Sequence, residues 1–139
     1  RKNNFEITHT SYEIINENNI KVGERKAKLM NYKRLVKSCD IGLSSVILKK
    51  NLITQNIKFP NLKTKEDFIF WLKISQKGKV IYALKKTLVK WRRNQNSLSS
   101  STIRKLIDGY YVYRHYLRFG IIKSLHSLFT LSINYLKKY

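Results

Sequence analysis

Residues 64–78 read TKEDFIFWLKISQKG, and this stretch carries the strongest structural signal in the sequence. Four apolar or small side chains recur in it at the spacing of one helix face: Phe68, Trp71, Leu72 and Ser75. Glu66 and Asp67 stand near the start, where the dipole of a helix favours negative charge, and Gly78 ends the pattern. The sequence therefore predicts a helix over residues 64–78.

The segments on both sides of this helix favour strands separated by turns. Phe5–Ile15 alternates and is rich in β-branched and aromatic residues, which is typical of a strand. Before residue 64 we also expect, in order, a turn, a basic connector, a short helix, a buried strand and a loop with the single proline: Asn16–Asn19, 24–30, Tyr32–Lys37, Ser44–Leu48 and Asn56–Leu62. After residue 78 we expect a strand pair, a polar loop and two basic helices hinged at Gly120: Val80–Leu84, Thr87–Trp91, Arg92–Ser101, 101–119 and 121–137. The predicted fold class is α/β, one mixed unit with an α-helical tail.

The composition is strongly basic and still rich enough in apolar residues to fold. The 139-residue chain holds 29 Lys and Arg against 8 Asp and Glu, a formal charge of +21. Its apolar fraction of 42% excludes a disordered chain, because enough surface can be buried to offset the ordering entropy. The charge favours anionic partners, which include nucleic acid, an acidic membrane surface and a diphosphate-bearing substrate. Acidic residues are so few that each aspartate is a candidate: Asp40, Asp67 and Asp108.

The cysteine and histidine content indicates neither a disulfide framework nor a metal site. Cys39 is the single cysteine, so we expect a reducing compartment and a buried structural thiol. His9, His115 and His126 fall in different elements without the spacing of metal ligands, and we expect them to be structural or exposed. No apolar stretch follows the charged start Arg1–Asn4, so no signal peptide is expected.

Asp67 has two interpretations. Thr64 to Asp67 matches a capping box, in which the Asp67 carboxylate would reach back to the backbone amide of Thr64. The same carboxylate, beside Phe68 and Trp71 and preceded by a loop, also stands where an enzyme could hold an ionised base at the edge of an apolar pocket.

Four blocks of the sequence, in order, resemble the family-two glycosyltransferases that build bacterial capsule, lipopolysaccharide and teichoic-acid glycans. KTKEDFIFWLKISQKGKVIYAL, residues 63–84, resembles their segment with a Glu-Asp pair, a following Trp-Leu, a Lys-x-Gly and a strand. The other three blocks resemble a strand and turn, a second strand and a Tyr-Arg loop of the family: Phe5–Asn16, Cys39–Leu48 and Trp91–Ser99. The resemblance covers nearly the whole chain up to about Phe119.

This resemblance implies the carboxy-terminal, acceptor-side part of a GT-A nucleotide-sugar transferase fold. Residues 1–100 would be the part with the catalytic base, and residues 101–139 a basic, membrane-associating helical tail. The Asp-x-Asp motif that holds a divalent metal, Mg or Mn, with the donor diphosphate does not occur in this chain, so the donor-binding half and the metal ligands would lie outside it. The full enzyme would transfer a sugar, with inversion, from a nucleotide-sugar donor to a glycan or lipid-linked acceptor in surface-polysaccharide biosynthesis. The isolated chain is expected to transfer no sugar.

The resemblance also assigns roles to single residues. Asp67 matches the catalytic base, and Glu66 matches the adjacent acidic position with a supporting role. Arg92 matches the arginine of the Tyr-Arg loop, where a guanidinium could hold the departing diphosphate. A solvated basic loop is the alternative for Arg92. Three further residues are candidates for lining the acceptor site, and ordinary core packing is the alternative for the last of them: Ser44, Ser45 and Trp71.

The tail allows more than one partner. Ile121–Tyr139 combines an apolar face with basic residues, so it could rest on the anionic inner face of the cell membrane, which implies a cytoplasmic, peripheral location. Packing onto the catalytic part is the alternative. Tyr110–Phe119 interleaves basic and aromatic residues, as a nucleic-acid surface does, but Tyr113, Tyr116 and Leu117 also form a packing stripe. A basic nucleic-acid-binding module and a non-catalytic membrane-associated scaffold remain the alternative functions, and no nucleic-acid-binding motif supports the first.

Overall fold

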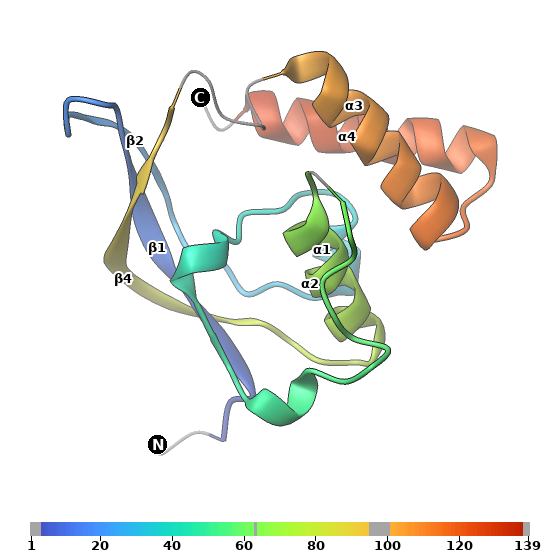
Figure 1. The fold of residues 1–139 in the computed structure, drawn as a ribbon, viewed down its shortest axis with the longest axis horizontal. Coiled ribbons are helices and arrows are strands. Elements are labelled where there is room, and N and C mark those ends of the chain that lie inside the picture. Colours follow the sequence, from blue (N-terminus) through green and yellow to red (C-terminus); the bar gives the residue numbers. More distant parts are fainter. Residues whose placement is uncertain (1–3, 63, 95–100, 138–139) are drawn as a thin grey trace.

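A computed structural model describes residues 4–62, 64–94 and 101–137, and its centre is a mixed sheet of four strands. The strands are β1, β2, β3 and β4, spanning Ile7–Ile15, Lys21–Arg25, Val46–Leu48 and Tyr82–Arg92. Strand β1 lies in the middle, antiparallel to β2 and β3 and parallel to β4 (Figure 1). The expected mixture of strands and helices is confirmed.

Strand β1 is the hub of the sheet because all three other strands pair with it. Its first residues, Ile7 to His9, pair with β3, and its last, Tyr12 to Ile15, pair with β2. Strand β4 runs along the other edge from Thr8 to Ile15. The side chains of Ile7, His9 and Ser11 alternate onto the buried face, as the period of a strand requires.

The structure corrects three of the expected strand boundaries. Residues 21–25 form strand β2, where we expected the end of a turn and a basic connector. The predicted pair Val80–Leu84 and Thr87–Trp91 is wrong, because one strand runs through both segments. Leu84 pairs with Thr10 and Thr87 with Ser11, so the two lysines between them are accommodated as a bulge in β4 and no turn forms.

The strand predicted at Ser44–Leu48 is observed as β3, which begins two residues later, at Val46. Residues Leu43–Ser45 form a 3₁₀ turn, which the Ser45 hydroxyl stabilises by donating to the Gly42 carbonyl at 2.7 Å. A second 3₁₀ turn spans Lys50–Leu52.

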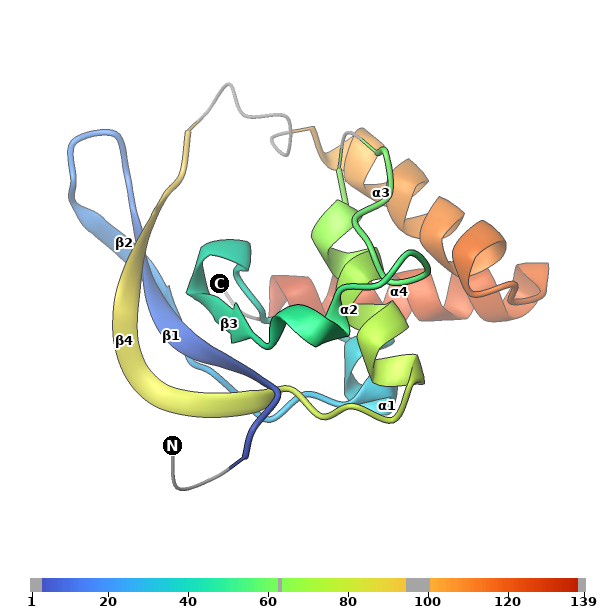
Figure 2. The same ribbon diagram turned by 60° about the horizontal axis from the view of Figure 1, so that its bottom comes forward.

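The helices lie on one side of the sheet. They are α1, α2, α3 and α4, spanning Tyr32–Leu35, Glu66–Gln76, Thr102–Tyr111 and Ile121–Leu136. Helix α3 continues as a π-helical segment, Val112–Tyr116, and the chain turns back near Gly120 as expected. In both views α2 lies between the sheet and the α3–α4 pair (Figure 1 and Figure 2).

Helix α2 is the core of the molecule. Seven of its eleven residues are buried: Phe68, Ile69, Phe70, Trp71, Leu72, Ile74 and Ser75. The Phe59 ring stacks on Phe70 with 4.3 Å between centroids, and Tyr113 meets Phe68 edge-on at 6.3 Å. Because apolar side chains cover most of the circumference of the helix, neighbours must enclose most of its surface.

The helical tail packs on the rest of the chain through a few specific contacts. The Tyr113 hydroxyl donates to the Val36 carbonyl at 2.7 Å, and the Asn134 amide donates to the Lys37 carbonyl at 3.0 Å. Tyr113 is buried, with Tyr116 and Leu117 half-buried against the same core. The packing interpretation of Tyr110–Phe119 is therefore confirmed.

Tyr113→Phe should lower the free energy of unfolding by about 1 to 2 kcal/mol, because the Val36 carbonyl loses its donor while the ring stays in place. Urea denaturation measures the change. Tyr111→Phe removes the same hydroxyl from an exposed ring and is the matched control, with an expected change within about 0.5 kcal/mol. Equal stability of both variants would mean that the Tyr113 bond does not hold the tail in place.

Candidate active site

The first turn of α2 begins without the capping box that the sequence predicts. Lys65 precedes the helix in the left-handed region, at φ 64°, and its side chain caps nothing. That backbone turn directs the Thr64 hydroxyl away from α2, where it donates to the Asp108 carboxylate of α3. The capping box is therefore wrong, and Thr64 instead ties the start of α2 to α3. A non-glycine residue held at positive φ costs about 1 kcal/mol or more, and such residues cluster at functional sites.

The Asp67 side chain is half-buried at this helix start. Its Oδ1 accepts from the backbone N–H of Phe68 at 2.7 Å. Burial raises the pKa of Asp67 above its ordinary value, and the Glu66 charge raises the pKa further, while the Phe68 hydrogen bond and the Lys65 charge lower it. A raised pKa makes Asp67 a stronger base than a solvated aspartate, which is a property that a general base needs.

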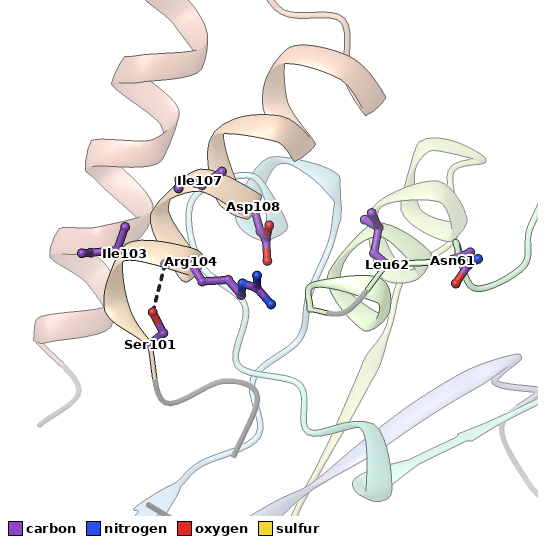
Figure 3. A pocket seen from close by; sticks show the side chains of 7 residues that line it. All are labelled: Asn61, Leu62, Ser101, Ile103, Arg104, Ile107 and Asp108. Carbon is purple, nitrogen blue, oxygen red and sulfur yellow. Dashed lines mark hydrogen bonds between the residues drawn. The ribbon is translucent and has the colours of Figure 1, made fainter. Parts of the chain in front are cut away.

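An open pocket of about 600 Å³ lies beside this helix start, between α3 and the loop before α2. Its lining combines apolar, hydroxyl, amide and charged side chains: Asn61, Leu62, Ser101, Ile103, Arg104, Ile107 and Asp108. The Arg104 and Asp108 side chains project from α3 toward the loop that carries Asn61 and Leu62 (Figure 3). Because Asp108 is bonded to Thr64, the pocket wall connects directly to the turn before Asp67.

Arg92 lies at the end of β4 and holds the β1–β2 turn. Its guanidinium donates to the carbonyls of Asn16 and Glu17 at 3.0 and 2.9 Å and to the Asn19 side chain at 2.6 Å. These three hydrogen bonds give Arg92 a structural role in holding the turn. The alternative in which Arg92 belongs to a solvated basic loop does not describe this arrangement. Its role toward a diphosphate stays a prediction. Residues 95–100 of the expected loop lie outside the described residues.

The three residues proposed to line an acceptor site belong to two separate elements, Trp71 to α2 and Ser44 and Ser45 to one 3₁₀ turn. Trp71 is fully buried, and its ring meets Phe70 edge-on with 5.1 Å between ring centroids. Trp71 therefore packs in the core, as the alternative to an acceptor-site role expects. Ser45 is buried and bonded to Gly42, whereas Ser44 is exposed on the same 3₁₀ turn. None of the three lines the pocket beside α3, and their role in binding stays a prediction.

The histidines and the cysteine lie away from this pocket. His9 is buried in β1, where its Nε2 lies 2.8 Å from the Lys28 carbonyl, and burial lowers its pKa. His115 packs on Tyr111, and Cys39 is half-buried against the core. Over residues 4–62, 64–94 and 101–137, no three His, Cys, Asp or Glu side chains come together as metal ligands.

Sequence reasoning missed the residues that α3 contributes. Asp108 was visible as one of only three aspartates, and Arg104 stands four residues before it, a spacing that puts both on one side of a helix. Nothing local indicates that Thr64 meets Asp108, because 44 residues separate them. Only the packing of α3 beside α2 brings these side chains to one place.

The chain is similar to curated bacterial glycosyltransferases. WfgD of Escherichia coli, named a UDP-Glc:alpha-D-GlcNAc-diphosphoundecaprenol beta-1,3-glucosyltransferase, is 37% identical over 76% of this chain and 41% of that enzyme. TuaG of Bacillus subtilis, named for teichuronic acid biosynthesis, is 28% identical over 78% of this chain and 43% of its own. WfaP of Escherichia coli, named with the same activity as WfgD, is 38% identical over 56% of this chain and 30% of its own.

The chain spans about two-fifths of the length of the first two of these relatives. No family model matches it, and no solved structure matches it. All three curated relatives are named glycosyltransferases, so the similarity supports a glycosyltransferase family. This supports the glycosyltransferase part of the sequence-based prediction. The GT-A fold and the inverting chemistry stay predictions.

Asp67→Asn should raise the free energy of unfolding at pH 7. A carboxyl with a raised pKa holds its proton more tightly in the folded chain, so its contribution to stability is full below the unfolded pKa of about 3.9 and is lost as pH rises through the raised folded pKa. Asparagine carries no charge and still accepts from Phe68, so its advantage at pH 7 should fade toward pH 4. Paired urea denaturations at both pH values measure the difference. A less stable variant at pH 7 would show that the carboxylate is not strained by burial.

Proposed function

We propose that this chain is the acceptor-side part of an inverting, GT-A-type glycosyltransferase and that Asp67 is its catalytic base. The observation that carries the proposal is the half-buried Asp67 carboxylate at the start of α2, whose pKa is raised, close in sequence to Thr64, which bonds to the pocket residue Asp108. The similarity to bacterial glycosyltransferases supports the same reaction class. Glu66, the neighbouring acid in the same turn, supports Asp67 through its charge, because that charge contributes to the raised pKa.

In this reaction the acceptor hydroxyl attacks the anomeric carbon of the donor sugar. The new carbon–oxygen bond forms on the face opposite the nucleotide, and the bond to the diphosphate breaks with its electron pair leaving on the diphosphate. The hydroxyl proton passes to Asp67. The hydroxyl becomes acidic only as its bond to the sugar forms, so the transfer is late and a carboxylate suffices as base. The raised pKa of Asp67 improves the match further.

The donor and the metal belong to the part of the enzyme beyond this chain. The aligned region covers 41 to 43% of the first two relatives, so most of the relatives' length has no counterpart here. The sheet also exposes large apolar side chains, among them Ile47 and Leu88 at 76% and 63%, which a further packed segment would cover. We assign the nucleotide-sugar donor and a divalent Mg or Mn to that segment. The chain alone then transfers no sugar.

The acceptor is lipid-linked, and the enzyme works at the inner face of the membrane. WfgD and WfaP are named for acceptors that carry a diphosphoundecaprenol. None of the helices described for this chain is long and apolar enough to cross a membrane. Helix α4 instead exposes an apolar row with intervals of three, four and seven residues: Ile122, Leu125, Phe129 and Leu136. The basic chain attracts anionic lipid, and this row inserts among the lipid chains.

Asp67→Asn in the complete enzyme should lower kcat at least about 10²-fold, because the amide keeps the shape and the Phe68 bond but cannot take the proton. Steady-state kinetics with a lipid-linked acceptor measure kcat, and the donor KM should stay near its original value. Glu66→Gln makes the same chemical change one residue away and should cost much less. Near-normal turnover of Asp67→Asn would leave Asp67 with a structural role only.

The pair Ile122→Gln and Phe129→Gln should weaken binding to anionic phosphatidylglycerol vesicles at least about tenfold, because the two exposed side chains lose their transfer into the lipid. Binding of the original chain should also fall as salt rises. Ile47→Gln, which removes another well-exposed isoleucine, from β3, is the control and should leave binding unchanged. If all three substitutions behave alike, the membrane contact is not on α4.

A further inference from the structure

The pocket between α3 and the loop before α2 has three chemically different regions. Asp108 and Asn61 offer oxygen and amide groups, Arg104 offers a guanidinium, and Ile103 and Ile107 form an apolar rim. We propose that this pocket binds the sugar-diphosphate head of a lipid-linked acceptor, with Arg104 holding the diphosphate. The proposal rests on the proposed glycosyltransferase function and assigns a site to its acceptor.

Arg104 is suited to a phosphate because no described residue uses its guanidinium. Its backbone N–H donates to the Ser101 hydroxyl at 3.3 Å, which fixes the first turn of α3 (Figure 3). Among the described residues its side chain has neither a hydrogen bond nor an ion pair. A guanidinium that lines a pocket without a protein partner can place two oriented donors on one phosphate.

Asp108 is placed to accept hydrogen bonds from sugar hydroxyls. Its carboxylate already accepts from Thr64, which orients it within the pocket. It stands one helical turn from Arg104, about 6 Å along the axis, so the two groups can contact different parts of one ligand. A carboxylate repels phosphate, so the diphosphate belongs at the Arg104 end and the sugar at the Asp108 end.

The apolar rim distinguishes a lipid-linked acceptor from a nucleotide-sugar donor, although both ligands carry a diphosphate. Ile103 and Ile107 line the pocket and are 73% and 63% exposed, so a ligand that leaves the pocket along α3 meets apolar surface. A nucleotide-sugar donor carries no apolar chain to use this rim. A lipid-linked acceptor has its lipid attached directly to the diphosphate, so its chain can contact the apolar row that Ile103 and Ile107 form beside Arg104 and Asp108.

The Thr64–Asp108 bond gives this site its relation to the base. Thr64 lies three residues before Asp67, so a sugar bound at Asp108 lies beside the turn that carries the base. The diphosphate then sits on the far side of the sugar from α2. In this arrangement Arg104 retains the phosphate and the sugar lies toward the turn that leads to Asp67, which does not itself line the pocket.

The test measures affinity in the 139-residue chain with three probes at 0.15 M salt. They are N-acetylglucosaminyl diphosphate with a short prenyl chain, the neutral glycoside of the same chain, and UDP. Arg104→Ala should weaken binding of the diphosphate lipid at least about tenfold, with Arg104→Lys in between. The neutral glycoside and UDP should bind both variants as they bind the original chain. Lys86→Ala, which removes an exposed cation from β4, controls for the overall charge and should change nothing.

Each other outcome overturns the assignment. An unchanged affinity for the diphosphate lipid would exclude Arg104 as its ligand, and an equal loss for the neutral glycoside would make Arg104 a structural residue. A loss confined to UDP would assign the site to the donor diphosphate. Failure of the wider glycosyltransferase proposal looks different: the Arg104-dependent binding would persist while the complete enzyme shows no turnover that depends on Asp67.

Discussion

The enclosure of helix α2 is the constraint on which the rest of the structure depends. A helix with apolar side chains around most of its circumference is stable only if neighbours cover that surface, and here β1, α1, the loop before α2 and the segment after α3 do so. The first turn of such a helix cannot be fully solvated. Asp67 is therefore held partly out of water, and the same burial that stabilises the fold raises the pKa of this carboxyl.

The start of α2 is locally unfavourable, and a contact between residues far apart in the sequence partly compensates for this. Lys65 adopts a left-handed conformation and no side chain caps the helix, both of which are locally unfavourable. The Thr64 hydroxyl, which could have capped the helix, bonds to Asp108 instead and joins α2 to α3. Departures from local preference that are compensated elsewhere are typical of functional sites, where geometry matters more than the most stable cap.

Much of the secondary structure and the position of one candidate site residue could be predicted from local patterns. Strand β1 and helices α2 and α4 follow from alternation and helical spacing, and Asp67 follows from its place in the first turn of α2. Strand β2 and the continuous β4 could not be predicted, because both depend on pairing with β1. The bulge that absorbs the two lysines of β4 has no signal of its own in the sequence.

The sequence by itself determined the elements, the scarcity of carboxylates, the position of Asp67 and the basic charge, because each of these depends on residue type and short spacing. The tertiary structure decided the parallel pairing of β1 with β4, the three bonds that commit Arg92 to the β1–β2 turn, and the pocket that Arg104 shares with Asp108. It also decided how strongly Asp67 is buried. These features join residues tens of positions apart, and such contacts follow from how elements pack, which local spacing does not encode.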